Sequence, residues 1–418
     1  MDHHEVGTCV GGTVAATQGR NLVVCCDGTN NEIGRLLSNV LKLYRISEKS
    51  DRQVVYYNPG IGTVGMRRTW GRSRQDLSSL FEMATGHGLD RDALNAYCFL
   101  CRHYKAGDSI YLFGFSRGAY TVRVVAGLVY LIGLLREHQV GFADYALKAY
   151  KGAKAGDDYA LARQFQRVVT PQCVPIRFLG LWDTVSSVIV PRHFPFIRFR
   201  LEELPFTSEN PAVQVVRHAI AIDEFRRMFR PRLWVEGQEF RHNPFSQRQA
   251  VIAQDCRQVW FAGCHSDVGG GFVEEESGLS KYPLIWMLEQ ARANGLLVRT
   301  QMINHIARGQ PRVGARDYAK PDPTATLHRS MNLGWGLLEV FPKSTAYQEW
   351  PARRRLAGLY LPRAEPRYIP PRSLLHTSVV ERIRKIPQYA PVNVTADYLT
   401  ESMSGPLPKP KPKGRRAP

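Results

Sequence analysis

Residues 109–128 read SIYLFGFSRGAYTVRVVAGL, and this stretch decides the fold. The run from Ser109 to Phe113 has the composition of a buried strand, and Ala119 to Leu135 is an apolar stretch of helical length. Between them stands Gly114-Phe115-Ser116-Arg117-Gly118, a G-x-S-x-G motif in the strand–turn–helix setting of a nucleophile elbow. Its two glycines would let strand and helix approach around a sharp turn, which makes Ser116 the candidate nucleophile.

Other apolar runs along the chain alternate with helical patterns. Strands are predicted at residues 21–26, 53–57, 176–182 and 258–264, and residues 77–105 have helical spacing. Strands that alternate with helices indicate a mostly parallel sheet with both faces covered by helices. The sequence therefore predicts an α/β fold of the α/β-hydrolase kind.

The 418 residues divide into three predicted segments. Residues 1–20 are expected to be a disordered N-terminus, and residues 21–395 a single α/β-hydrolase domain. Residues 396–418 are rich in proline and lysine and are expected to form a disordered tail. The periodic pattern weakens from about residue 311, but strand-like and helix-like pieces continue beyond it, so this part is assigned to the same domain.

Composition is that of a globular protein, with 44% hydrophobic and 22% charged residues. The net charge of +19 could attract anionic partners, and residues 405–418 contribute five lysines and arginines and no acid. The N-terminus has no signal-peptide pattern, and the longest uncharged apolar run, residues 124–135, is too short to span a bilayer. A cytoplasmic location is expected, with export by a route that needs no signal peptide left open.

Two residues that directly follow predicted strands complete a candidate catalytic triad with Ser116. Asp183 follows the strand at residues 176–182, and His265 follows the strand at residues 258–264. Because the carboxyl ends of parallel strands meet at one edge of a sheet, the three side chains are expected to lie together. A serine needs a base, and the base needs an orienting acid, so the order Ser116, Asp183, His265 predicts nucleophilic catalysis.

A second triad assignment stays open on sequence grounds. Asp267 lies two residues past His265, and His376 follows the apolar pair Leu374-Leu375. If the acid came after the penultimate strand and the histidine after the last, the triad would be Ser116–Asp267–His376. His218 and His328, in contrast, lack a comparable setting and are expected to have core or surface roles.

Backbone N–H groups near Ser116 are candidates for an oxyanion hole. Arg117 would open the helix after Ser116, and Gly28 follows the first predicted strand, where such folds often place the second donor. A plain Asp27-Gly28 turn explains the same residues equally well. The lone C-x-x-C of Cys98 and Cys101 lacks the second pair of ligands of a zinc site, so neither a metal nor another cofactor is expected.

Several long motifs occur in one order along the chain: NLVVCCDGTNNE, YYNPGIGT, ATGHGL, GDSIYLFGFSRGAYTVRVVAGLV, GLWDTVSSV and GCHSDVGGGF. Over residues 21–395 the chain resembles an α/β-hydrolase domain family, shared by bacterial and fungal proteins, that includes type VI secretion lipase effectors. The resemblance implies an α/β-hydrolase fold and, for the effector branch, phospholipase activity through a triad that falls on Ser116, Asp183 and His265.

These observations lead to two functional hypotheses. The first is a serine hydrolase that cleaves carboxylic esters, lipids or phospholipids above all, through an acyl-enzyme, with peripheral contact to an anionic membrane. The second, suggested by the positive charge, is a basic adaptor or nucleic-acid-binding protein built on a hydrolase scaffold. No recognisable nucleic-acid-binding motif supports the second hypothesis, so nucleic acid is not expected as a partner.

Overall fold

The computed structural model describes the chain from Gly19 to Glu401 with gaps. The described residues are 19–28, 36–60, 87–153, 159–185, 189–192, 198–201, 204–243, 252–332, 335–336, 339–340, 343–344, 349–350, 355–356 and 358–401. The segments expected to be disordered, 1–20 and 396–418, lie mostly outside these ranges.

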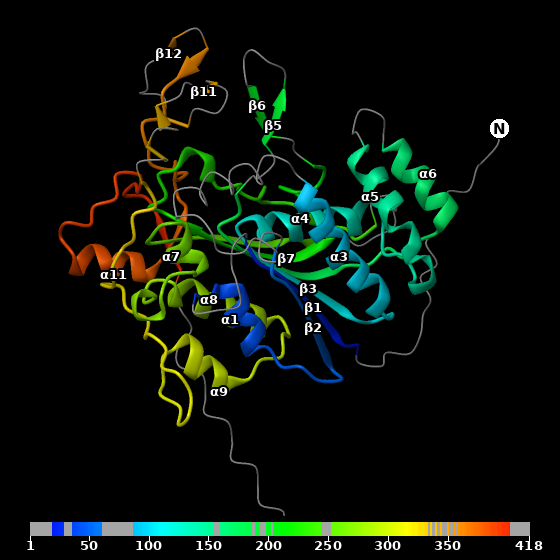
Figure 1. Ribbon diagram of the computed structural model, residues 1–418, viewed down its shortest axis with the longest axis horizontal. Helices are drawn as coiled ribbons and strands as arrows, with labels where there is room; N and C mark the ends of the chain where they lie inside the picture. Colours follow the sequence, from blue (N-terminus) through cyan, green and yellow to red (C-terminus); the bar gives the residue numbers. More distant parts are fainter. Residues whose placement is uncertain are drawn as a thin grey trace, which may run out of the picture.

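An eight-stranded sheet, parallel throughout, forms the centre of the molecule (Figure 1). Its strand order is β15-β14-β10-β7-β4-β3-β1-β2. The strands are β1 (Asn21–Cys26), β2 (Gln53–Asn58), β3 (Ser109–Phe115), β4 (Ile176–Trp182), β7 (Val213–Ala221), β10 (Asp255–Phe261), β14 (Leu374–His376) and β15 (Leu399–Glu401). The chain moves outward from β1 in both directions, so the topological switch point lies between β1 and β3, where α/β sheets commonly place their sites.

Helices cover both faces of this sheet (Figure 1). One face packs against α3 (His87–His103), α4 (Arg117–Leu131), α5 (Ala143–Lys151) and α6 (Ala160–Val169). The other packs against α1 (Asn39–Ile46), α8 (Lys281–Ala293) and the segment formed by α9 (Thr300–Met302) and η5 (Ile303–Ala307).

The alternation of buried side chains along the strands explains this layering. In β1, Leu22 and Val24 join the first core and Val23 and Cys25 the second, because successive strand residues point to opposite faces. A strand that is buried on both faces has no polar side, which is why it reads as a continuous apolar run. The predicted α/β-hydrolase-like fold class is therefore confirmed.

Shorter elements surround the sheet. They include α7 (His265–Gly269), α11 (Thr377–Lys385), η1 (Glu137–Phe142), η3 (Arg227–Phe229) and η4 (Glu274–Glu276). Three small antiparallel sheets add β5 (Ile189–Arg192) with β6 (Arg198–Leu201), β8 (Glu239–Phe240) with β9 (Ile252–Ala253), and β13 (Leu359–Tyr360) between β11 (Lys343–Ser344) and β12 (Arg355–Leu356). No helix of the described residues is both long enough and apolar enough to cross a bilayer.

Several strands of the main sheet depart from the sequence prediction. The predicted strand at residues 258–264 is β10, which begins and ends three residues earlier, and β14 lies where only strand-like pieces were expected. The central strand β7 was not predicted, because Arg217 and His218 interrupt its apolar run; Arg217 is buried and paired with Asp255 of the neighbouring strand. At the other end of the chain, β15 pairs with β14, so the sheet extends to Glu401, six residues beyond the predicted domain boundary at 395. Its three residues are too few to give a periodic signal.

Candidate active site

Ser116 occupies the tight connection between β3 and α4. The strand ends at Phe115 and the helix begins at Arg117, so Ser116 alone makes the turn. Its backbone has φ 57° and ψ −121°, a conformation that costs a non-glycine residue about 1–3 kcal/mol. Its N–H donates to the carbonyl of Trp182 at 3.1 Å, which ties the turn to the end of β4. Ser116 is partly exposed between buried neighbours, as a nucleophile must be.

Both glycines of the motif are required by close backbone contacts. A Cβ on Gly114 would lie 2.4 Å from the carbonyl oxygen of Gly118, and a Cβ on Gly118 would lie 2.1 Å from the carbonyl oxygen of Cys26. The first contact joins strand to helix across the elbow, and the second presses α4 against the end of β1. The close approach that the sequence predicted for these glycines is confirmed.

Asp183 and His265 meet at the carboxyl ends of their strands. His265 Nδ1 lies 2.5 Å from Asp183 Oδ2, and both side chains are buried. Asp183 follows β4 and has φ 39°, while its Oδ1 accepts the N–H of Ala221 at 2.9 Å. The contact through Nδ1 leaves Nε2 as the nitrogen of His265 that can face a substrate or a serine hydroxyl.

Arg367, which sequence reasoning missed, also binds Asp183. Its Nη1 donates to Oδ1 at 2.6 Å and its Nη2 to Oδ2 at 2.9 Å, with both side chains fully buried. Burial by itself would raise the pKa of Asp183, but Arg367 and His265 outweigh it and hold that pKa well below its usual range. Asp183 is therefore ionised at neutral pH. No local sequence pattern around Arg367 could have indicated this pairing across 184 positions.

Two aromatic rings enclose the imidazole of His265. The ring centroid of Phe115 lies 4.7 Å from it, and that of Phe229 lies 5.0 Å away in an edge-on arrangement. The backbone N–H of His265 donates to Glu224, whose carboxylate pairs with Arg226 at 2.9 Å. Although burial opposes it, the contact with Arg226 lowers the pKa of Glu224 to about 2. The ring of His265 is thus fixed on several sides.

The two predicted oxyanion donors differ in the structure. Arg117 is the first residue of α4, directly after Ser116 at the positive end of the helix dipole. The N–H of Gly28, in contrast, donates to Oδ1 of Asp27 at 2.8 Å, while Oδ2 of that carboxylate accepts the hydroxyl of Tyr57 at 2.8 Å. The N–H of Gly28 is therefore engaged by the side chain of Asp27, and its role as an oxyanion donor stays a prediction.

Asp267 and His376, the alternative pair, have other partners in the structure. Asp267 Oδ1 lies 2.7 Å from His328 Nδ1, and Asp267 Oδ2 accepts the N–H of Cys264 at 3.0 Å. His376 caps the N-terminus of α11, with its Nδ1 accepting from the N–H of Ser378 and its ring stacked on Phe261. Burial lowers the pKa of His376 to about 3. The structure thus gives Asp267 a loop-ordering contact and His376 a capping contact.

His218 has the core role expected for it. Its Nε2 accepts the N–H of Thr184 at 3.3 Å, and its Nδ1 lies 3.4 Å from the side-chain oxygen of Gln258. Burial, reinforced by Arg123, lowers its pKa to about 3, so the ring is neutral. It supports the backbone just after Asp183 and stays outside the proposed chemistry.

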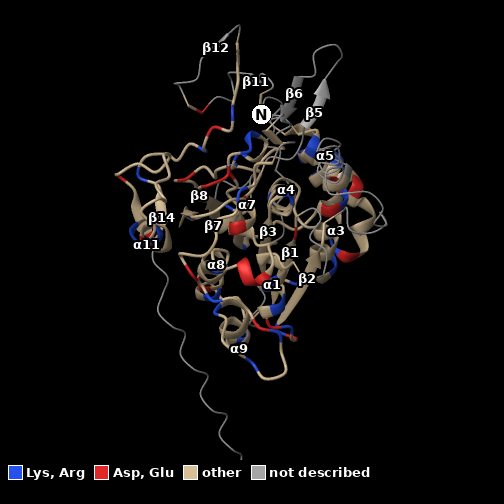
Figure 2. Cartoon of the chain, turned by 60° about the vertical axis from the view of Figure 1, so that its left-hand side comes forward, with Lys and Arg blue, Asp and Glu red and all other residues tan. Residues whose placement is uncertain are grey.

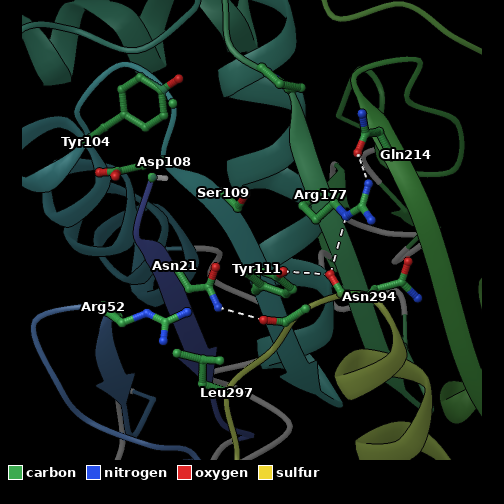
Figure 3. Close-up of a pocket in the computed structure, with 14 residues that line it drawn as sticks. Asn21, Arg52, Tyr104, Asp108, Ser109, Tyr111, Arg177, Gln214, Asn294 and Leu297 are labelled. Atoms are coloured by element: carbon green, nitrogen blue, oxygen red, sulfur yellow. Dashed lines mark hydrogen bonds between the residues drawn. The ribbon is translucent and has the colours of Figure 1, made fainter. Parts of the chain in front are cut away.

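A cavity of about 620 Å³ lies away from these residues (Figure 3). Its walls include Asn21, Ser109 and Arg177, at the amino ends of β1, β3 and β4. Tyr111 and Arg177 point toward the carbonyl of Asn294 there and bond to it (Figure 3). Because Ser116, Asp183 and His265 follow the carboxyl ends of the strands, this cavity is at the opposite edge of the sheet and is not their substrate site.

A family model described as "T6SS, Phospholipase effector Tle1-like, catalytic domain" matches residues 20–290. The chain belongs to this family. The matched residues contain Ser116, Asp183 and His265, whereas Arg367 lies beyond them. The resemblance that the sequence motifs indicated is thereby confirmed.

Individual relatives are longer than this chain. An uncharacterised protein of Saccharomyces cerevisiae is 34% identical over 230 residues, which cover 51% of this chain and 33% of the yeast protein. A crystal structure of an uncharacterised protein from Pseudomonas aeruginosa is 19% identical with a TM-score of 0.35, covering 67% of this chain and 46% of that one. The structure of the Tle1 effector bound to the VgrG spike of the type 6 secretion system is 19% identical with a TM-score of 0.30, covering 66% and 57%.

Proposed function

We propose that this member of the Tle1-like phospholipase catalytic domain family is a serine hydrolase that cleaves the carboxylic esters of phospholipids. The observation that carries the proposal is the buried Asp183–His265 hydrogen bond, whose imidazole packs on Phe115, the residue directly before the strained elbow at Ser116. Ser116, Asp183 and His265 all follow the carboxyl ends of strands in one parallel sheet. Family membership supports the phospholipid as substrate.

In the proposed reaction, the Ser116 hydroxyl oxygen attacks the ester carbonyl carbon while its proton passes to Nε2 of His265. Asp183 accepts the Nδ1–H of the resulting imidazolium and stabilises its positive charge. The tetrahedral oxyanion lies at the N-terminus of α4, beside the N–H of Arg117. Collapse of this intermediate breaks the ester C–O bond, and His265 returns the proton to the departing alcohol.

The acyl-enzyme on Ser116 is then hydrolysed by water. His265 removes a proton from the water, whose oxygen attacks the acyl carbon, and the same proton returns to Ser116 as the fatty acid leaves. This second step restores the free enzyme and consumes one water for each ester bond cleaved. The products are a fatty acid and a lysophospholipid.

The test is hydrolysis of vesicles made of phosphatidylcholine and phosphatidylglycerol, with fluorophosphonate labelling in parallel. Ser116→Ala should abolish labelling and lower the release of fatty acid by a factor on the order of 10³ or more, because the covalent step is lost. Ser50→Ala, in the exposed turn before β2, is the matched control and should retain both activities. A folded Ser116→Ala protein that still cleaves the vesicles would exclude the triad. A wild type that neither labels nor cleaves would favour a binding protein on a hydrolase scaffold.

A further inference from the structure

Arg367 is buried in the polar centre of the site although it lies in the chain well past the residues that the family model matches. It binds both oxygens of Asp183, and it also donates to the carbonyls of Ala221, at 2.8 Å, and Phe229. Its own carbonyl accepts the side-chain amide of Asn393 at 3.0 Å. These contacts fix the guanidinium of Arg367 against the carboxylate of Asp183.

A buried arginine of this kind needs a reason, because removing a guanidinium from water is costly unless its partners compensate. One reason would be structural, since Arg367 links β4, β7 and the η3 region. The geometry adds a second reason. Oδ2 of Asp183 receives both Nη2 of Arg367 and Nδ1 of His265, so the positive charge of Arg367 acts on the oxygen that faces the imidazole.

We propose that Arg367 is a positioning residue that fixes the Asp183 carboxylate toward His265 and offsets part of its negative charge. An aspartate without this partner would stabilise the imidazolium form of His265 more strongly, and His265 would act as a base only at higher pH. Arg367 therefore extends ester hydrolysis toward acidic pH. This inference rests on the proposed function, because it assigns His265 as the base.

The other charged and titratable groups near Asp183 and His265 have partners of their own. This supports assigning the effect on the pH dependence to Arg367. Glu224 lies behind the backbone of His265 and is matched by Arg226. Arg230, next to η3, pairs with Glu349 and Glu365 at 3.3 Å. The neutral ring of His218 bonds to the backbone that follows Asp183. None of these groups, as the structure describes them, shares an oxygen with the Asp183–His265 bond.

The test compares Arg367→Gln and Arg367→Lys with wild type in the pH dependence of kcat/KM for a soluble ester and of fluorophosphonate labelling. In Arg367→Gln the acidic limb of both profiles should move up by about one pH unit, because the variant removes a nearby positive charge that disfavours the imidazolium form. Arg367→Lys keeps the charge and should move the limb by less than half as much. In both variants kcat should fall, because the carboxylate is held less firmly.

Arg217→Gln is the matched control, since Arg217 is also buried and binds both oxygens of an aspartate, Asp255, at the other end of β7. It should leave the acidic limb in place. An unmoved limb in Arg367→Gln would overturn the proposal even if kcat fell, and so would failure of both Arg367 variants to fold, because Arg367 would then serve the fold alone. Failure of the proposed function is distinguishable, since wild type itself would then not label at Ser116.

Discussion

Two of the three proposed catalytic residues have a strained backbone conformation. Ser116 has φ 57° and Asp183 has φ 39°, in a region that side chains with a Cβ adopt only at a cost. Each residue comes directly after a strand, Ser116 after β3 and Asp183 after β4, at the point where the chain leaves the sheet. The hydrogen bonds from Ser116 N to Trp182 and from Asp183 N to Ala219 hold the two strained turns to neighbouring strands.

The contacts of each acid and histidine predict how substitutions should rank. Asp183→Asn and His265→Ala should each lower kcat by a factor on the order of 10³ or more, because they remove the oriented base. Asp267→Asn and His376→Ala should lower it much less, since these side chains order a loop and cap α11. Steady-state kinetics on a soluble ester with the four folded variants is the measurement. Larger losses in the second pair would replace the triad by Ser116–Asp267–His376.

His328 predicts a pH dependence of stability. Burial alone would lower its pKa, but hydrogen bonds to Asp267 and Glu276 raise the pKa above the usual 6.5. A raised folded-state pKa contributes stability that is fully present below the unfolded-state value and is lost as the pH rises through the folded-state value. The free energy of unfolding of wild type should therefore exceed that of His328→Gln most at about pH 5.5, and the difference should shrink toward pH 8.

Urea unfolding of both proteins across this pH range measures the effect, with His138→Gln on the exposed η1 as the control. A difference between wild type and His328→Gln that is constant with pH would show that His328 contributes through packing on Phe272 rather than through its charge.

At the scale of elements, β3, the elbow and α4 behave as one unit whose position is set by backbone contacts. Phe115 pairs with Trp182 in the register of β3 with β4, and Gly118 touches the end of β1. The carboxyl ends of three adjacent strands thus fix where α4 begins. A displacement of this helix would move Ser116 and the N–H of Arg117 together.

Gly118→Ala should therefore damage both stability and activity. The added Cβ would lie 2.1 Å from a backbone oxygen of Cys26 and 2.5 Å from that of Asp27, neither of which can turn away. We expect a loss of about 1–3 kcal/mol in the free energy of unfolding, as for other overpacked sites. Activity should fall by about 10²-fold if α4 shifts by about 1 Å.

Gly141→Ala is the control for this prediction, because a Cβ there meets no atom within 4 Å, and it should change stability by less than about 0.5 kcal/mol. Thermal unfolding measures the stability of the two variants, and ester hydrolysis measures their activity. Equal behaviour of Gly118→Ala and Gly141→Ala would mean that the close contact at the elbow is not needed.

At the scale of the whole molecule, the positive charge is not gathered on one helix of the described chain. Figure 2 shows lysines and arginines interspersed with acidic residues on elements of both faces of the sheet. The strongest local concentration of positive charge in the sequence is the segment 405–418, with five basic residues and no acid. This segment lies outside the described residues.

Deletion of residues 405–418 should weaken binding to anionic vesicles at low salt, because basic residues near such a surface contribute about 1 kcal/mol each. The difference should become small at high salt, where surface charges are screened. Hydrolysis of a small soluble ester should not change. Co-sedimentation with phosphatidylglycerol vesicles across a salt series measures this, with a full-length variant carrying glutamine at the five basic positions as the control. Equal binding of all proteins at every salt concentration would remove the tail from the membrane hypothesis.

The sequence by itself determined the elements whose signal is local. Apolar runs flanked by turns predicted β1, β2, β3 and β4 to within a few residues, because a strand buried on both faces must be apolar throughout. The elbow was predictable because its glycines, its serine and its flanking elements are contiguous in the chain. The same adjacency to strand ends indicated Asp183 and His265, which the structure joins by a hydrogen bond.

The tertiary structure alone decided the contacts between distant segments. Strand β7 escaped prediction because a buried ion pair and a buried neutral histidine replace apolar residues in it, and both are satisfied only by neighbouring strands. The partners of Asp267 and His376, and the pairing of Arg367 with Asp183, depend in the same way on which loops meet above the sheet. A buried polar group needs a hydrogen-bonding or charged partner to offset the loss of water. For these residues the partner is distant in the sequence and is brought close only by the fold.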